Sequence, residues 1–150
     1  MTRAAGASDA PVVARLLHDF NAEFGDYSPG VDVLTERLGQ LLASADVSVL
    51  LAGEGPDGLV VLRFRPSFWT GAPDAYLEEL YVAPHRRGRG IGRALLEATL
   101  AFARDAGAEH IDLATSVDDT AALALYESCG FTNREGRPDG PQMLYYERDL

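Results

Sequence analysis

The stretch of sequence that decides the fold reads Arg87-Gly88-Arg89-Gly90-Ile91-Gly92. It lies between an apolar run over residues 75–82, typical of a strand, and a helical pattern over residues 90–106. Glycines let the backbone approach a ligand and point successive N–H groups at it. The first turn of a helix adds free N–H donors and the positive end of its dipole. Together with the arginines, these features suit a pyrophosphate; the glycine pattern alone also fits a loop of solvated arginines.

Two well-known phosphate-binding loops do not match this stretch. A P-loop needs Gly-Lys followed by serine or threonine, and no lysine is present here. A dinucleotide fingerprint needs a third glycine where Arg93 stands, and it follows the first strand of its domain rather than a third long strand. These two kinds of phosphate-binding loop are therefore excluded.

Hydrophobic periodicity and turn residues predict the elements on either side of the glycine stretch. The expected order is β-α-α-β-β-β-α-β-α-β, with one more short strand after Gly130. We predict one α/β domain over residues 1–150, with a mixed sheet of six to seven strands and about four helices on both faces. The expected strands are 2–5, 47–52, 59–64, 75–82, 110–115 and 143–147; the expected helices run from about 10 to 24, 31–43, 90–106 and 120–129; a turn is expected at 55–58 and a loop at 66–74.

The composition limits the classes of partner. The chain has 150 residues, of which 47% are apolar, and a formal net charge of -10. Binding to nucleic acid needs a broad cationic surface, so we expect none, whereas a small cationic substrate would be attracted. The alternative is that the acidity only keeps the protein soluble. No apolar run is long enough to span a membrane, and no signal peptide is recognisable, so we expect a cytoplasmic location and no membrane partner.

The cysteine and histidines favour neither a disulfide nor a metal site. Cys129 is the single cysteine, so no internal disulfide is possible. The three histidines stand at spacings that match no metal-binding pattern, and we expect no metal. They are His18, His85 and His110.

Three motifs together resemble the GNAT superfamily of N-acetyltransferases, over roughly residues 50–131. The first is Arg87-x-x-Gly90-x-Gly92 with Leu95-Leu96 beyond it. The second is Leu80-Tyr81-Val82-Ala83-Pro84, which resembles the end of the family's fourth strand. The third is Leu125-Tyr126-x-x-x-Gly130-Phe131, similar to the family's Leu-Tyr-x-x-x-Gly-Phe signature. The resemblance implies an enzyme that uses acetyl-CoA as co-substrate, and by analogy a homodimer.

The resemblance also implies which residues bind the co-substrate. Main-chain groups of the fourth strand would bind the thioester carbonyl and the pantetheine arm, and these are Leu80, Tyr81 and Val82. The pyrophosphate would be held by the N–H groups of Gly88, Arg89, Gly90, Ile91 and Gly92, together with Arg87 and Arg93. The family often has asparagine seven residues before the tyrosine, where this chain has Asp119. An ionised aspartate accepts but cannot donate a hydrogen bond, so whether Asp119 binds the cofactor arm stays open.

Acetyl transfer to an amine needs a base for the ammonium proton and an acid for the leaving thiolate. Glu78 and Glu79 lie on the predicted strand 75–82, where adjacent side chains face opposite sides unless a bulge intervenes. The strand is similar to that of polyamine acetyltransferases in the superfamily, which favours Glu78 as the base, with Glu79 in reserve. Both could instead be solvated charges. Tyr126 is the expected acid, and its alternative role is packing.

The acceptor is expected to be a primary amine of a small molecule. Acidic and aromatic residues at the end of the first helix could receive it, and so could two aromatic residues in the loop before strand 75–82. These are Phe20, Glu23, Phe24, Asp26 and Tyr27, and then Phe68 and Trp69. The alternatives are acetylation of a protein N-terminus or lysine, and a non-catalytic acyl-CoA-binding module.

Overall fold

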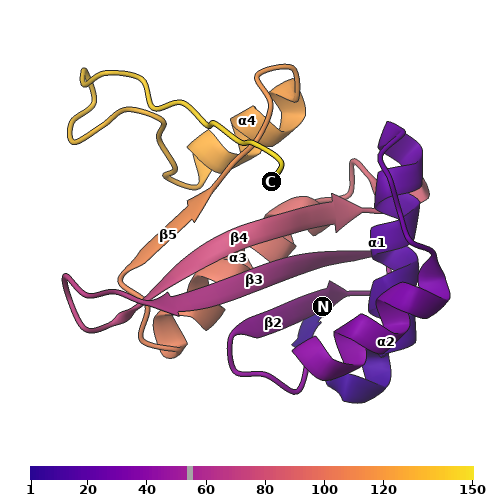
Figure 1. Cartoon of the computed structure of the whole chain (residues 1–150). Coiled ribbons are helices and arrows are strands. Elements are labelled where there is room, and N and C mark those ends of the chain that lie inside the picture. The colour runs from indigo at the N-terminus through magenta and orange to yellow at the C-terminus, as the bar shows by residue number, and fades with distance from the viewer. Residues whose placement is uncertain (54–55) are drawn as a thin grey trace. The chain divides into compact units, whose positions relative to one another are not determined.

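The computed structural model describes residues 1–53 and 56–150, so Gly55 of the turn predicted at 55–58 lies outside the described residues. The chain divides into two compact units, Met1–Leu113 and Ala114–Leu150. The elements of the first unit are β1 Thr2–Ala4, α1 Ala10–Phe24, α2 Val31–Leu41, β2 Val47–Ala52, β3 Gly58–Pro66, β4 Pro73–Val82, α3 Ile91–Asp105 and β5 His110–Leu113, with short 3-10 turns at Ala7–Asp9 and Pro84–Arg86; the second unit holds α4 Thr120–Ser128 (Figure 1).

The first unit is built on a five-stranded sheet in the order β1-β2-β3-β4-β5. The first four strands pair antiparallel as a meander, and β5 pairs parallel with β4. A parallel neighbour needs a crossover connection, and α3 supplies it between β4 and β5. The predicted mixed sheet is therefore confirmed.

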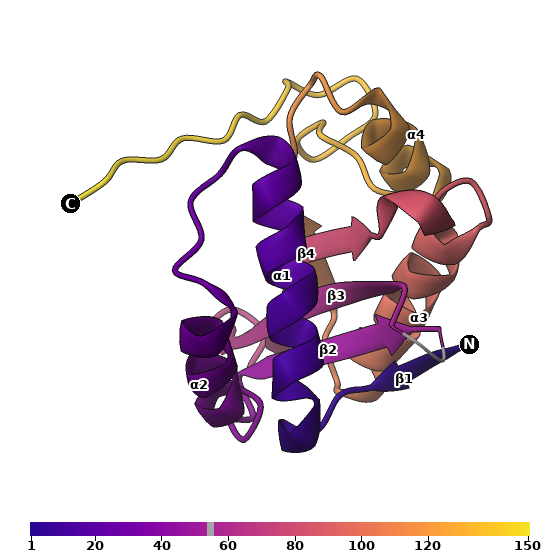
Figure 2. The ribbon, with the colours of Figure 1, turned by 90° about the vertical axis from the view of Figure 1, so that its right-hand side faces the viewer.

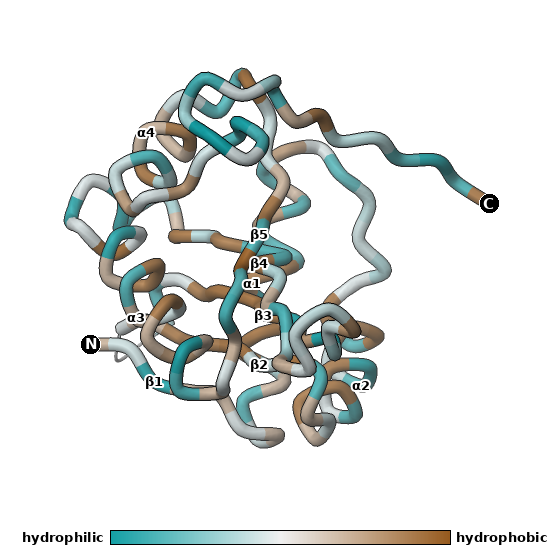
Figure 3. The backbone as a smooth tube through the Cα atoms, turned by 90° about the vertical axis from the view of Figure 1, so that its left-hand side faces the viewer, coloured by the Kyte–Doolittle hydropathy of each residue, from teal (hydrophilic) through white to brown (hydrophobic). Residues whose placement is uncertain are grey.

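Helices cover both faces of this sheet, as predicted (Figure 2). Apolar side chains of α1 and α2, among them Val13, Leu16 and Leu38, form one buried cluster with β2 and β3. On the opposite face, Leu95 and Leu96 of α3 are fully buried. The hydrophobic stretches of the backbone gather on the central strands (Figure 3). Burial on two faces explains why β2 and β3 read as nearly continuous apolar runs.

The predicted ends of the first helix follow from its end residues. Pro11 lies in the first turn of α1, where its missing N–H costs nothing. Gly25 closes the helix with a φ of 71°, a left-handed conformation that glycine adopts without strain. The helix boundaries predicted from the sequence are therefore confirmed to within two residues here.

The predicted count of six to seven strands was wrong. Among the described residues, no strand follows Leu113, so neither the expected strand at 143–147 nor a short one after Gly130 forms. Within the second unit, the only bridge joins Arg134 to Gln142. A strand needs a neighbouring strand to bond its main chain, and the run of apolar residues at 143–146 does not supply one.

Gly58, the first residue of β3, is required by its neighbours. A Cβ atom at this position would lie 2.6 Å from the carbonyl oxygen of Tyr81 and 3.2 Å from Cδ1 of Leu95. The oxygen belongs to the backbone of β4 and cannot move aside. We expect Gly58→Ala to lower the free energy of unfolding by about 2 kcal/mol, measured by urea denaturation. Gly39→Ala in α2 is the control, since a Cβ there meets no atom within 4 Å and alanine favours a helix. Equal stability of Gly58→Ala and the unchanged protein would contradict this prediction.

Candidate functional site

The glycine stretch forms a turn that opens α3. Gly88 and Gly90 have φ values of 74° and 78°. A Cβ atom at either glycine would meet no other atom within 4 Å. These glycines are therefore needed for their left-handed backbone rather than for close packing. The turn was predicted correctly because glycine is the residue that adopts this left-handed conformation most readily.

The turn leaves a row of main-chain donors unused. The first hydrogen bond of the helix runs from the N–H of Ala94 to the carbonyl oxygen of Gly90, at 3.0 Å. No backbone carbonyl in residues 1–53 and 56–150 accepts a hydrogen bond from the N–H groups of residues 88–92. These five N–H groups lie at the positive end of a 15-residue helix. Such an arrangement favours an anion.

The arginines around the turn differ in their partners. Arg87 is bound to Glu23 at 2.8 Å and Arg86 to Asp57 at 3.2 Å. Arg93 lies 3.9 Å from Glu97 one helical turn away. Arg89 is exposed and forms no ion pair with any carboxylate among the described residues. Arg89 is therefore the arginine of the turn whose charge no described carboxylate offsets.

One edge of β4 is open beside the glycine turn. β5 pairs with β4 only from Asp74 to Leu77. β4 continues to Val82, and from residue 78 onward no strand of the described chain lies on that side. Within the first unit, main-chain groups on this edge are therefore available to a ligand that lies along the strand, except the carbonyl oxygen of Val82, which accepts a hydrogen bond from Nε of Arg87 at 3.0 Å.

The direction of each main-chain group on β4 follows from its pairing with β3. The N–H of Ala83 donates to the carbonyl oxygen of Asp57 at 2.8 Å, on the β3 side. Main-chain groups of alternate residues point to opposite edges of a strand. Those of Tyr81 therefore point to β3, and those of Leu80 and Val82 point to the open edge. The structure thus brings two of the three predicted strand residues to that edge.

A β-bulge interrupts β4 just before this open segment. Leu62 of β3 pairs with Leu77, and the preceding Val61 pairs with Glu79. Glu78 is consequently an extra residue with no partner of its own in the register. A bulge breaks the strict alternation of side chains along a strand. The bulge therefore allows the side chains of Glu78 and Glu79 to face the same side of the sheet.

Both glutamates lie on the face of the sheet that α1 and α2 cover. Glu79 shares the face of its partner Val61, which belongs to the buried cluster under these helices. Arg63, two residues along β3 from Val61, lies on that face as well, and its Nε donates to the carboxylate of Glu78. Glu78 is thus held in an ion pair.

Glu79 has a different environment. Burial raises the pKa of its carboxyl group, and the negative charges of Glu78 and Asp26 raise the pKa further. Asp26 follows α1, so the end of that helix lies within electrostatic reach of β4. A carboxylate with a raised pKa is a better proton acceptor near neutral pH than an ordinary one.

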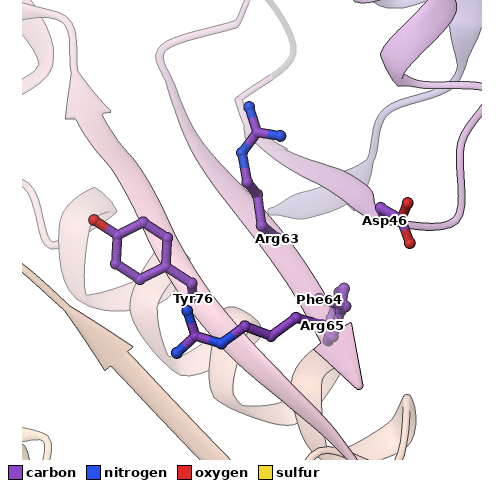
Figure 4. Close-up of a pocket in the computed structure, with 5 residues that line it drawn as sticks. All are labelled: Asp46, Arg63, Phe64, Arg65 and Tyr76. Atoms are coloured by element: carbon purple, nitrogen blue, oxygen red, sulfur yellow. The ribbon is translucent and has the colours of Figure 1, made fainter. Parts of the chain in front are cut away.

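A hollow of about 190 Å³ opens on the same strands. Figure 4 shows its lining residues, which are Asp46, Arg63, Phe64, Arg65 and Tyr76. Arg65 lies 3.5 Å from Asp112 of β5, and Arg63 binds Glu78. These two arginines were not among the residues predicted from the sequence. Their spacing of two residues in a strand was the available signal, because it puts both on one face.

Tyr126 of the second unit is buried, and its motif has a structural explanation. The N–H of Phe131 donates to the carbonyl oxygen of Tyr126 at 3.1 Å, and that of Gly130 to Glu127 at 3.1 Å. Gly130 has a φ of 91°. This is the hydrogen-bond pattern of a helix end closed by glycine. The rings of Tyr126 and Phe131 pack edge to face beside it, with their centres 5.8 Å apart. The spacing Tyr-x-x-x-Gly-Phe therefore specifies how α4 ends.

Asp119 caps the other end of α4. Its Oδ1 accepts a hydrogen bond from the N–H of Ala122 at 3.1 Å. This contact accounts for the aspartate in terms of helix stability. Its role toward a cofactor stays a prediction.

The described part of the chain offers neither a cluster of metal ligands nor a membrane-spanning helix. In residues 1–53 and 56–150, no three His, Cys, Asp or Glu side chains are grouped so that they could hold a metal ion. No helix among the same residues is both long and apolar enough to cross a membrane.

Known proteins resemble this chain in sequence. The family model for the acetyltransferase (GNAT) family matches residues 14–131. The aminoglycoside N(6')-acetyltransferase type 1 of Stenotrophomonas maltophilia is 38% identical over 113 residues, which cover 71% of this chain and 74% of that protein. The mycothiol acetyltransferase of Cellulomonas flavigena is 35% identical over 108 residues, 70% of this chain, but the match spans only 27% of that longer protein.

The fold agrees with the same assignment. A solved structure from Arthrobacter sp. FB24, named as an acetyltransferase, is 50% identical, with a TM-score of 0.92 over 100% of this chain and 96% of that one. The family model covers the glycine turn, the open edge of β4 and the Tyr126 motif. The chain therefore belongs to the acetyltransferase (GNAT) family, whose members are N-acetyltransferases that use acetyl-CoA as co-substrate.

Proposed function

We propose that this protein transfers the acetyl group of acetyl-CoA to a primary amine of a small cationic molecule. The observation that carries the proposal is the bulge in β4, which supports two carboxylates on one face directly before the open edge. Relatives named for aminoglycoside and mycothiol support a small acceptor. The net charge of -10 favours a cationic one.

The donor site follows from the open main-chain groups. The N–H groups of residues 88–92 would hold the pyrophosphate, and Arg89 would add positive charge. The open edge of β4 supports the main chain of Leu80 and the N–H of Val82 as partners of the pantetheine arm and the thioester carbonyl, since the carbonyl oxygen of Val82 is bound by Arg87. It gives no such support to the main chain of Tyr81, which points to β3.

Glu79 is the base that the geometry favours. It would take a proton from the ammonium group, directly or through water, so that the neutral amine attacks the thioester carbon. Glu78, which the resemblance favours, is engaged by Arg63 and would keep that arginine in place. A raised pKa lets Glu79 accept the proton at neutral pH, as a general base must.

Tyr126 would complete the transfer. As the carbon–sulfur bond breaks, the leaving thiolate needs a proton, and the resemblance supports the phenol of Tyr126 as its source. The phenol would then recover its proton from solvent. The expected homodimer and cytoplasmic location likewise stay predictions from the sequence.

An acceptor panel tests the proposed function. Release of the coenzyme A thiol from acetyl-CoA would be followed with aminoglycosides, polyamines, amino acids and lysine-containing peptides. We expect release that depends on a small polycationic amine and is much slower with peptides. Release with peptides alone would favour the protein-acetylation alternative. Binding of coenzyme A without release from any acceptor would favour the non-catalytic module.

A further inference from the structure

Glu23 and Arg87, 64 residues apart in the chain, meet where the glycine turn begins. Arg87 donates from its Nη2 to Glu23 at 2.8 Å and from its Nε to the carbonyl oxygen of Val82 at 3.0 Å. Its guanidinium carbon lies 5.7 Å from the ring centre of Tyr81, on its face. Arg87 therefore holds the last residue of β4, the end of α1 and the first residue of the turn together.

Tyr81 belongs to the same cluster of side chains. Its hydroxyl donates to the same Glu23 oxygen at 3.3 Å, and its ring stacks on Phe20 of α1 with centres 4.8 Å apart. Burial raises the pKa of the Tyr81 phenol, and Glu23 raises it further, so the hydroxyl stays protonated and remains a donor. One oxygen of the Glu23 carboxylate thus accepts hydrogen bonds from both Arg87 and Tyr81, next to the glycine turn.

The side chain of Arg87 is therefore bound to other parts of the protein, whereas the resemblance implies that it binds the pyrophosphate. A guanidinium has five N–H donors in a planar fork, and here two of them point to Glu23 and Val82 while its face covers Tyr81. The open amides begin at the next residue, Gly88. Fixing Arg87 therefore fixes where the row of amides starts, without contact between its side chain and the anion.

We propose that Glu23 is a positioning residue for acetyl-CoA, acting through Arg87 to hold the row of amides at residues 88–92 in its binding conformation. This inference rests on the proposed donor site. Glu23 lies on α1, in the stretch whose acidic and aromatic residues could receive the acceptor according to the sequence. The structure instead connects it to the donor side.

The test is calorimetric binding of coenzyme A, which needs no acceptor. Glu23→Gln keeps the shape but removes the charge, and we expect its affinity for coenzyme A to fall about fivefold, as for one half-exposed ion pair. In turnover, the KM for acetyl-CoA should rise by a similar factor while kcat and the KM for the amine change less than about twofold. Glu36→Gln on α2 changes the net charge equally. It should change neither the affinity for coenzyme A nor the KM for acetyl-CoA.

Three further variants make the outcome decisive. Arg87→Met should weaken binding, and adding Glu23→Gln to it should cause little further loss, because both act through one contact. Tyr81→Phe, which removes only the hydroxyl, should give a smaller effect of the same sign. Thermal unfolding checks that each variant is folded.

Tighter binding by Glu23→Gln would overturn the proposal, since it would mean that Glu23 withholds Arg87 from the pyrophosphate. Unchanged binding of coenzyme A by Glu23→Gln would also overturn it. The same holds if the loss of affinity in the double variant equals the product of the losses in Glu23→Gln and Arg87→Met. If the unchanged protein did not bind coenzyme A at all, the donor site itself would be refuted, which is a separate result.

Discussion

Replacing Glu79 with glutamine is expected to lower kcat about 100- to 1000-fold, the loss typical of removing a general base. Glutamine keeps the size of the side chain but cannot accept the ammonium proton. The matched variant is Glu78→Gln, on the neighbouring residue of the same bulge. We expect it to lower kcat about tenfold at most, because it loosens Arg63 without removing the proton acceptor. Steady-state kinetics at saturating acetyl-CoA measure both.

The pH profile gives an independent check of the same assignment. A general base works only when ionised, so kcat should fall as the pH falls through the raised pKa of Glu79. This acidic limb should persist in Glu78→Gln and disappear from the residual activity of Glu79→Gln. A large loss and a missing limb in Glu78→Gln instead would show that the residue favoured by the resemblance is the base.

Tyr126→Phe is expected to lower kcat about 10- to 100-fold while the affinity for coenzyme A stays nearly unchanged. Phenylalanine preserves the ring contact with Phe131 at 5.8 Å, so the loss would come from the hydroxyl rather than from the fold. Single-turnover kinetics and calorimetric binding separate the two effects. Tyr145→Phe removes a hydroxyl that bonds the exposed Glu147 and should leave turnover unchanged. Unaltered turnover in Tyr126→Phe would exclude the acid role.

Local signals in the sequence predicted most of the elements correctly. Gly25 ends α1 and the Val47–Ala52 run forms β2, because a left-handed glycine and a short apolar run each specify structure within a few residues. The strand predicted at 143–147 does not form. The apolar run at 143–146 describes what a strand could bury, whereas a strand exists only where another backbone lies beside it.

The candidate site was predictable to a different degree at each position. The open amides of residues 88–92 follow from glycine spacing and the start of a helix, which are local features. The ion pair between Glu23 and Arg87 depends on contact between residues 64 positions apart, which no local pattern encodes. The bulge at Glu78 was likewise unpredictable, because adjacent glutamates read the same in a regular strand and in an interrupted one.

The bulge also has an evolutionary consequence. Because Leu77 and Glu79 already pair with consecutive residues of β3, deleting Glu78 would leave every other pair in the ladder unchanged. Loss of this residue would therefore keep the pairing of β3 with β4 while removing the carboxylate that Arg63 binds. A lineage could thus change the number of acidic groups on this face of the sheet without altering the strand pairing.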